Sequence, residues 1–251
     1  MSNYKHQTGL STEDYQKCQA IWRFYKTVKT ESEVIRSGFG MYGVYHYNMR
    51  AVFDLDRSES DLEHVMGMQI LVTLVSLFFP VLLSREEKDL AIYTTLVHEA
   101  GERIFGDIPD DGNRDEARKN QVELQAVREL VAELPAEVAA RIGTIFMEMQ
   151  QRSSRLGQFL YCAGKVEAIL QGLIYESEGR GGDISVKMAV VDLSQQDKRG
   201  IERSNSKMLV DIWSVHFFDV TKNMYASEIF TGILRAAMED VRGAWFAWLE
   251  Q

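Results

Sequence analysis

The sequence predicts an all-α fold, because most of the chain falls into segments with apolar residues at helical spacing and only one short segment has the character of a strand. Apolar residues make up 45% of the 251-residue chain and charged residues 26%, a composition that supports a globular core. The three prolines and the lack of low-complexity tracts argue against long linkers. We therefore expect a helical bundle, in which residues 184–191 form a short strand or an extended segment.

Capping residues, glycine and proline mark where the helices begin and end. The first helix, residues 11–35, starts at Ser11–Asp14, and a glycine-rich stretch at residues 38–43 interrupts the chain after it. Ser60 and Glu63 have the spacing of a capping box and begin the second helix. The expected helices beyond this point continue through residues 65–83, run from Arg85 through His98 and Glu99, and cover residues 115–134, 136–152, 156–175, 206–223 and 225–249.

The apolar run Val65–Leu83 carries no formal charge and approaches the length of a membrane span. It contains several polar residues and Pro80, follows Glu63–His64 directly, and has no basic flank on either side. We therefore expect a buried core helix and no membrane partner.

Net charge and cysteine content exclude several classes of function. The net charge of −9 and the pI near 5.2 argue against a broad nucleic-acid-binding face. Cys18 and Cys162 are isolated, which indicates neither a disulfide framework nor a thiolate metal site. The first residues lack the apolar core of a signal peptide, so a cytoplasmic location is the expectation.

The C-terminal segment is rich in aromatic residues. Trp245, Phe246 and Trp248 cannot all lie on one narrow helical stripe, and three large aromatics seldom sit exposed together. We therefore expect this segment to be buried in the core or against a second copy, which favours a homodimer or a larger homo-oligomer.

One polar cluster indicates chemistry. On a helix, His98, Glu99 and Glu102 can crowd around one point, where an imidazole and two carboxylates could bind a divalent metal beside a proton-transfer group. The same spacing also fits an exposed helix with two glutamates and a stray histidine. Taken alone, His64 is more typical of a hydrogen-bonded structural histidine than of a metal ligand, and Arg36 is more typical of a surface arginine.

These residues and their neighbours, taken together, resemble the HD-domain metal-dependent phosphohydrolases, and in particular the 5′-deoxynucleotidase-like branch. The resemblance is collinear over residues 36–176. The matching segments are Arg36–Phe39, Glu63–His64, Leu96–Glu102 with Gly106–Ile108, the positions Lys119, Glu123 and Ala126, Leu134–Pro135, and Ser154 to Glu176 with its Gly164–Glu167 motif.

The resemblance implies a helical bundle around one divalent metal ion (Mn, Co, Mg, Fe or Zn). It implies that His64, His98 and Glu99 are metal ligands. In the same way it implies that Glu102 is a general acid or base, that Asp107 positions the nucleoside or water, that Arg36 holds the phosphate, and that Lys119 contributes to substrate binding. Residues 36–176 would form the HD domain. Residues 1–35 would be a helix packed on it, and residues 177–251 a helical extension of the same compact unit.

The sequence departs from the pattern of this family at three positions. The family's His-Asp doublet is His98-Glu99 here, and Leu156 replaces a usual glutamate. Gly164 stands where a metal-binding aspartate is expected, so one ligand is missing. Glu99, which is longer than aspartate, or Glu167, one helical turn from Gly164, could compensate for it.

Two functions follow from the resemblance. The first is metal-dependent hydrolysis of (deoxy)ribonucleoside 5′-monophosphates or a related phosphoester, with a small phosphorylated molecule as the partner. The alternative is a degenerate HD domain that binds a nucleotide or a protein without turnover, which the altered ligand positions favour.

Overall fold

The fold is all-α, as the sequence predicts. The computed structural model describes residues 10–35, 61–99, 116–132, 134–179, 183 and 195–243, with side chains left aside at residues 24–35, 61, 116, 117, 119 and 195–197. Within these ranges no β-strand forms, and the single β-bridge joins Asp183 to Met208. The helices of the described residues are α1 (Thr12–Ile35), α3 (Asp61–Phe78), α4 (Arg85–Thr95), α6 (Glu116–Val131), α7 (Ala136–Gln151), α8 (Arg155–Ser177), α10 (Gln195–Ser204), α11 (Leu209–Thr221) and α12 (Ser227–Arg242).

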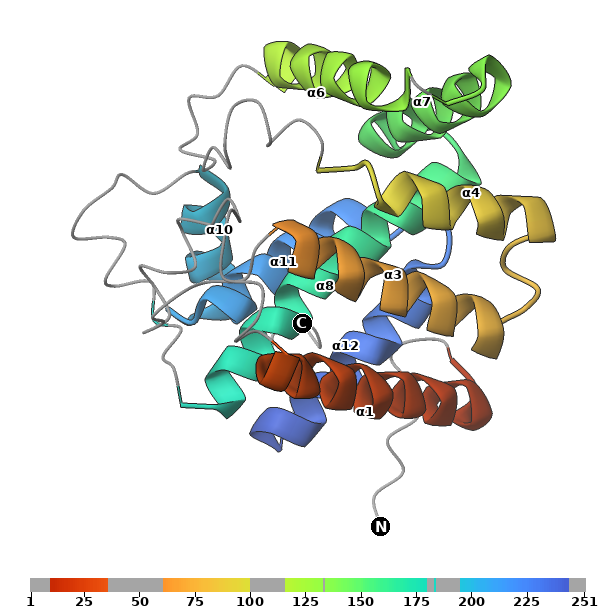
Figure 1. The fold of residues 1–251 in the computed structure, drawn as a ribbon. Coiled ribbons are helices and arrows are strands. Elements are labelled where there is room, and N and C mark those ends of the chain that lie inside the picture. Colours follow the sequence, from red (N-terminus) through yellow and green to blue (C-terminus); the bar gives the residue numbers. More distant parts are fainter. Residues whose placement is uncertain are drawn as a thin grey trace.

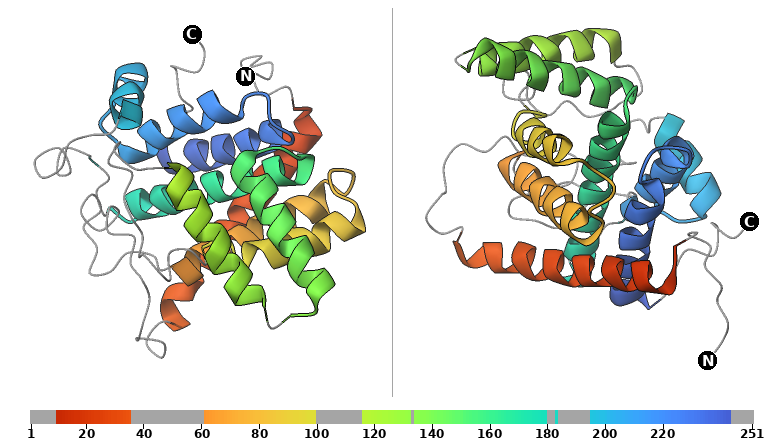
Figure 2. Two further views of the ribbon diagram at one scale, coloured as in Figure 1. Left: turned by 90° about the horizontal axis from the view of Figure 1, so that it is seen from above. Right: turned by 90° about the vertical axis from the view of Figure 1, so that its right-hand side faces the viewer.

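Helix α8 is the centre of the bundle, and most of its side chains are buried. It packs against α3, α4, α7, α11 and α12, while α6 packs on α7 and α10 on α11. The views agree that α8 runs through the middle of the molecule, between the α6–α7 pair on one side and α1 on the other (Figures 1 and 2). The N-cap Ser154 accepts a hydrogen bond of 3.0 Å from the backbone of Gly157, which fixes where this helix begins.

The two ends of the described chain meet where α1 packs along α12 and α3. Tyr15 donates a hydrogen bond to Glu239, and the indole of the buried Trp22 donates to Asp240 at 3.2 Å. A Cβ on Gly232 would lie 2.9 Å from the sulfur of Cys18, so only glycine lets the two helices approach this closely. The first helix of the chain is therefore part of the packed bundle.

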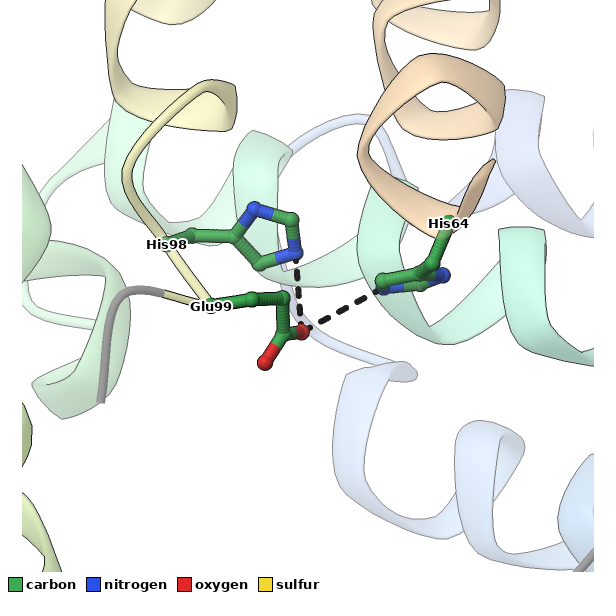
Figure 3. Close-up of side chains that lie close together, drawn as sticks. All are labelled: His64, His98 and Glu99. Atoms are coloured by element: carbon green, nitrogen blue, oxygen red, sulfur yellow. Dashed lines mark ion pairs between the residues drawn. The ribbon is translucent and has the colours of Figure 1, made fainter. Parts of the chain in front are cut away.

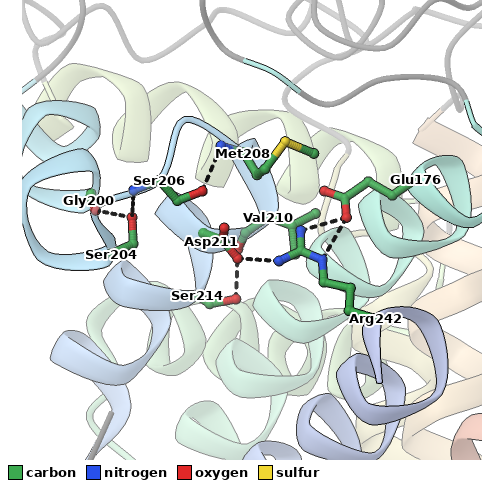
Figure 4. A network of polar contacts seen from close by, with 9 residues as sticks. All are labelled: Glu176, Gly200, Ser204, Ser206, Met208, Val210, Asp211, Ser214 and Arg242. Carbon is green, nitrogen blue, oxygen red and sulfur yellow. Dashed lines mark hydrogen bonds and ion pairs between the residues drawn. The ribbon is translucent and has the colours of Figure 1, made fainter. Parts of the chain in front are cut away.

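A charged network joins the ends of α8, α11 and α12 (Figure 4). Arg242 donates to Glu176 at 2.9 Å and to Asp211 at 2.5 Å. Although burial disfavours its charge, the two carboxylates raise the pKa of Arg242, whereas burial raises the pKa of Glu176. α12 then ends at Gly243, whose φ of 68° is a left-handed conformation suited to glycine.

Several expected helices end earlier than their sequence pattern suggests, among them the one at residues 225–249, which ends at Arg242 with Gly243 as its C-cap. The apolar run to residue 83 is helical only as far as Phe78, because Pro80 disfavours helical geometry in the residue before it. The expectation that His98 and Glu99 lie on a helix is wrong, since α4 ends at Thr95 and both residues lie in the turn that follows. Helix α10 was not expected, because Ile201 is its only large apolar residue.

Some expectations fall outside the described residues. They concern the glycine-rich stretch 38–43, the strand or extended segment 184–191, and the aromatic residues 245–248. Among the described helices, none is both long and apolar enough to cross a membrane. The core-helix expectation for residues 65–78 agrees with burial of one face of α3, whose inward side chains include Met68, Leu71 and Val75.

Candidate metal centre

A capping box positions α4, the helix that leads to the candidate site. The Ser84 hydroxyl accepts from the backbone N–H of Glu87 at 3.2 Å, and the Glu87 carboxylate accepts from the backbone N–H of Ser84 at 2.7 Å. The same carboxylate accepts two hydrogen bonds from Arg155, the first residue of α8. The start of α4 is thereby tied to the central helix.

The turn after α4 carries His98 and Glu99 toward α3. The last carbonyl groups of a helix lack partners within it, and here neighbouring groups supply them. Thr95 Oγ donates to the carbonyl of Ile92 at 2.7 Å, and the backbone N–H of Val97 donates to the carbonyl of Thr94 at 3.1 Å. The ring of His98 lies 2.7 Å, through its Nδ1, from the carbonyl of Thr95. His98 therefore contributes to ending α4, the helix that precedes it.

The structure brings three of the predicted site residues together (Figure 3). Oε1 of Glu99 lies 3.0 Å from Nε2 of His98 and 3.5 Å from Nε2 of His64. One potential ligand atom from each residue lies within 4.8 Å of the other two. His64 comes from the first turn of α3, so the site joins this helix to the turn that follows α4. Both imidazoles are buried and Glu99 is partly exposed.

The Nδ1 atoms of both histidines point away from Glu99. A carbonyl can only accept, so the contact with Thr95 places a proton on Nδ1 of His98, and in the neutral ring the lone pair is then on Nε2. This Nε2 atom is buried, and it has no hydrogen-bond partner in the described part of the chain. On α3, Nδ1 of His64 contacts the carboxylate of Glu167, which is completely buried on α8.

This arrangement points acceptor atoms at one another. With a proton on each Nδ1, the Nε2 lone pairs of His64 and His98 both face a carboxylate oxygen of Glu99. Such groups repel unless a positive charge lies among them. A divalent cation would satisfy all three atoms, and two imidazoles with one carboxylate form a known donor set for catalytic metals with open coordination positions. The residues present therefore fit a metal ion.

Position 164 of α8, where the resemblance implies a fourth ligand, has room for a side-chain carbon. A Cβ on Gly164 would meet only the side chain of Met68, at 3.6 Å from its sulfur, which is ordinary van der Waals contact. The structure places Glu167 on the Nδ1 side of His64, and not among the three ligand atoms. Of the two ways in which the missing aspartate could be compensated, the one that relied on Glu167 as a ligand finds no support in this geometry.

The other predicted site residues are not placed. Arg36, Glu102 and Asp107 lie outside the described residues. The backbone of Lys119 belongs to α6, but its side chain is not described. Conversely, the sequence did not indicate that Thr95 and Glu167 hold the two histidines. The role of Glu167 is visible only in its contact with His64 across the bundle, because the two residues are 103 positions apart in the sequence.

Comparison with known proteins identifies the family. A family model described as HD domain matches residues 47–204, which is more than half of the chain. The chain belongs to the HD domain family. The predicted recognition is thereby confirmed. HD domains generally depend on a divalent metal, and in this HD domain protein the cluster of His64, His98 and Glu99 is the group of described residues that could hold one.

The similar curated proteins are 5′-deoxynucleotidases. The human 5′-deoxynucleotidase HDDC2 is 26% identical over 123 residues, which are 49% of this chain and 57% of the human protein. The mouse protein of the same name is 26% identical over 156 residues, or 62% of this chain and 70% of the mouse protein. The match to the human relative thus spans little more than half of its length. Among solved structures, none matches the chain significantly.

Proposed function

We propose that this HD domain protein is a metal-dependent phosphohydrolase acting on (deoxy)ribonucleoside 5′-monophosphates or a related phosphoester. The observation that carries the proposal is the convergence of His64, His98 and Glu99, with both imidazole Nδ1 atoms engaged elsewhere. The nucleotide substrate is proposed from the similar 5′-deoxynucleotidases and from the resemblance of residues 36–176 to that branch.

The donor set narrows the choice of metal. Imidazole nitrogens suit transition metals such as Mn²⁺, Fe²⁺, Co²⁺ and Zn²⁺, whereas Mg²⁺ is usually held by oxygen ligands. With two imidazoles and one carboxylate, His64, His98 and Glu99 would hold the ion and leave coordination positions for water and substrate. When bound, such an ion lowers the pKa of a water molecule and polarises a phosphoryl oxygen.

The remaining residues of the chain would complete the reaction. We assign proton transfer to Glu102, orientation of the substrate to Asp107, and charge neutralisation at the phosphate to Arg36 and Lys119. A carboxylate beside the attacking water can accept its proton and return it to the leaving oxygen. A guanidinium can bind two phosphate oxygens at once. Burial of both histidines restricts access of bulk water from the bundle side.

A phosphate-release assay tests the proposal. Purified protein is incubated with a panel of nucleoside monophosphates and with Mn²⁺, Co²⁺, Fe²⁺, Zn²⁺ or Mg²⁺, beside His98→Ala and Glu102→Gln. We expect phosphate release that His98→Ala abolishes through loss of a ligand, and that Glu102→Gln abolishes through loss of proton transfer. Gly143→Ala is a matched control, because a Cβ at this position on α7 meets nothing within 4 Å.

A second candidate function is a degenerate domain that binds a nucleotide or a protein without turnover. Gly164 favours it, because a position expected to hold a ligand offers no side chain. If no nucleotide and metal give phosphate release above the His98→Ala background, the binding function without turnover is favoured over hydrolysis.

A further inference from the structure

The buried carboxylate of Glu167 has no part in the proposed chemistry, yet it contacts a predicted metal ligand. Glu167 lies on the central helix α8 and is completely buried. Its Oε2 contacts Nδ1 of His64, the ring nitrogen on the far side from Glu99. A buried carboxylate carries a large desolvation cost unless hydrogen bonds satisfy it, so this contact stabilises the carboxylate and the imidazole together.

The backbone of α3 makes room for this contact. A Cβ on Gly67 would lie 2.7 Å from Cδ of Glu167 and closer still to its Oε1. Any other residue at position 67 would push the carboxylate away from His64. Gly67 is also buried in the interior of a helix, where glycine lowers stability by roughly 1 kcal/mol relative to alanine. The close approach of α8 gives a physical reason for this unfavourable residue.

We propose that Glu167 is a positioning residue for the metal centre and that Gly67 is the position that permits it. Glu167 holds the proton of His64 on Nδ1, which turns the Nε2 lone pair toward Glu99. The negative charge of Glu167 also lies behind the ring, on the side opposite to Nε2, and so strengthens the binding of a cation at Nε2. His98 is held in the same tautomer by the neutral carbonyl of Thr95. The two histidines therefore differ in the group at Nδ1, which is a carboxylate for His64 and a neutral carbonyl for His98.

This inference rests on the proposed function only in that His64 is a metal ligand there. A merely structural pair between Glu167 and His64 would affect folding stability without affecting metal affinity. The two roles can therefore be separated by measurements that need no substrate.

The first test is the tautomer of His64 in the full-length protein without metal. Long-range ¹H–¹⁵N correlation spectra of ¹⁵N-histidine-labelled protein, assigned with His64→Gln, distinguish a proton on Nδ1 from one on Nε2. We expect the Nδ1–H form in the parent and a mixture of forms in Glu167→Ala. The Nε2–H form in the parent would overturn the proposal, whatever the enzyme activity proves to be.

The second test is metal affinity, read from the visible absorption of added Co²⁺. We expect Glu167→Gln and Gly67→Ala each to weaken binding by about 10–100-fold, the range typical of lost partners of metal-bound histidines. The double variant should bind no more weakly than the weaker single variant, since both changes remove the same contact. Gly143→Ala controls for the exchange of a helical glycine by alanine, because a Cβ there meets nothing within 4 Å.

The outcomes separate the two proposals. Parent-like Co²⁺ affinity in folded Glu167→Gln would overturn the positioning role, even with phosphate release intact. If Gly67→Ala fails to fold, the Co²⁺ affinity of Glu167→Gln and the His64 tautomer of the parent still test the positioning role. If the parent binds no Co²⁺ and releases no phosphate, the proposed function fails, and the tautomer alone decides whether Glu167 orients His64.

Discussion

Gly164 on α8 faces Met68 on α3, and a Cβ on Gly164 would lie 3.6 Å from the methionine sulfur. The contact is an ordinary van der Waals distance, so a Cβ at position 164 fits without displacing the backbone. Met68 is completely buried and lies one helical turn after His64. The position expected to hold a metal-binding aspartate therefore has room for a Cβ. A larger side chain would contact Met68, whose flexible side chain can move.

Restoring the aspartate should strengthen metal binding. We expect Gly164→Asp to bind Mn²⁺ more tightly than the parent, because the resemblance implies a metal-binding aspartate at this position and its carboxylate would add an anionic oxygen donor. Since an ion that binds only the folded state stabilises it, the melting temperature of the variant should rise more with added Mn²⁺. Differential scanning fluorimetry over a range of Mn²⁺ concentrations measures this.

Gly164→Ala is the control for this experiment. It removes the same helical glycine without adding a ligand. The free energy of unfolding should therefore rise by roughly 1 kcal/mol, and this rise should not depend on added metal. If Gly164→Asp melts below the parent and gains nothing from Mn²⁺, the added carboxylate meets like charge from Glu99, and the site has been rebuilt around its present ligands.

Removal of the N-cap of α4 should destabilise the protein. Ser84→Ala removes the hydroxyl that accepts from the backbone of Glu87, which should lower the free energy of unfolding by about 0.5–2 kcal/mol. For a chain of this size, each kcal/mol corresponds to roughly 2–4 °C in melting temperature. Thermal melts compare it with Ser84→Thr, which keeps a capping hydroxyl; an equal loss in both variants would contradict the role of the cap.

The carboxylate of Glu87 should make stability depend on acid pH. Although burial opposes it, hydrogen bonds from Ser84 and Arg155 hold the pKa of Glu87 below its ordinary value of 4.5. A carboxyl whose pKa is lowered by folding contributes stability above its unfolded pKa and loses it as pH falls through the folded pKa. Glu87→Gln should therefore be less stable than the parent at neutral pH, and the difference should vanish in acid.

Urea unfolding at a series of pH values measures the difference between Glu87→Gln and the parent. The same substitution in an Arg155→Gln background serves as the control, because one source of the lowered pKa is then gone. A constant difference between the two proteins down to strongly acid pH would show that the charge of Glu87 is not what stabilises α4.

Both cysteines should be unreactive in the folded protein. Cys18 on α1 and Cys162 on α8 are completely buried, and burial raises the pKa of each thiol to about 12. Because the thiolate is the reactive form, we expect a disulfide reagent at about pH 8 to label neither residue until the protein unfolds, and both thereafter. One rapidly labelled thiol in native protein, assigned with Cys18→Ser, would show that its helix opens independently of the rest.

The sequence by itself determined the class of fold and most helix positions. Helical periodicity and capping residues are local, so the expected helix at residues 11–35 agrees closely with α1, and the one at 156–175 with α8. The resemblance to the HD-domain family, carried by motifs in the sequence, was also enough to single out His64, His98 and Glu99, which the structure brings together.

Only the tertiary structure decided how these residues are held. Periodicity predicts a helix through Glu99, but α4 ends at Thr95, because threonine and histidine side chains compete for the last helical carbonyl groups. The sequence shows Glu167 only as one turn beyond a missing ligand. Its contact with His64 depends on the packing of α8 against α3 at Gly67, and that distance between helices is not encoded in either segment alone.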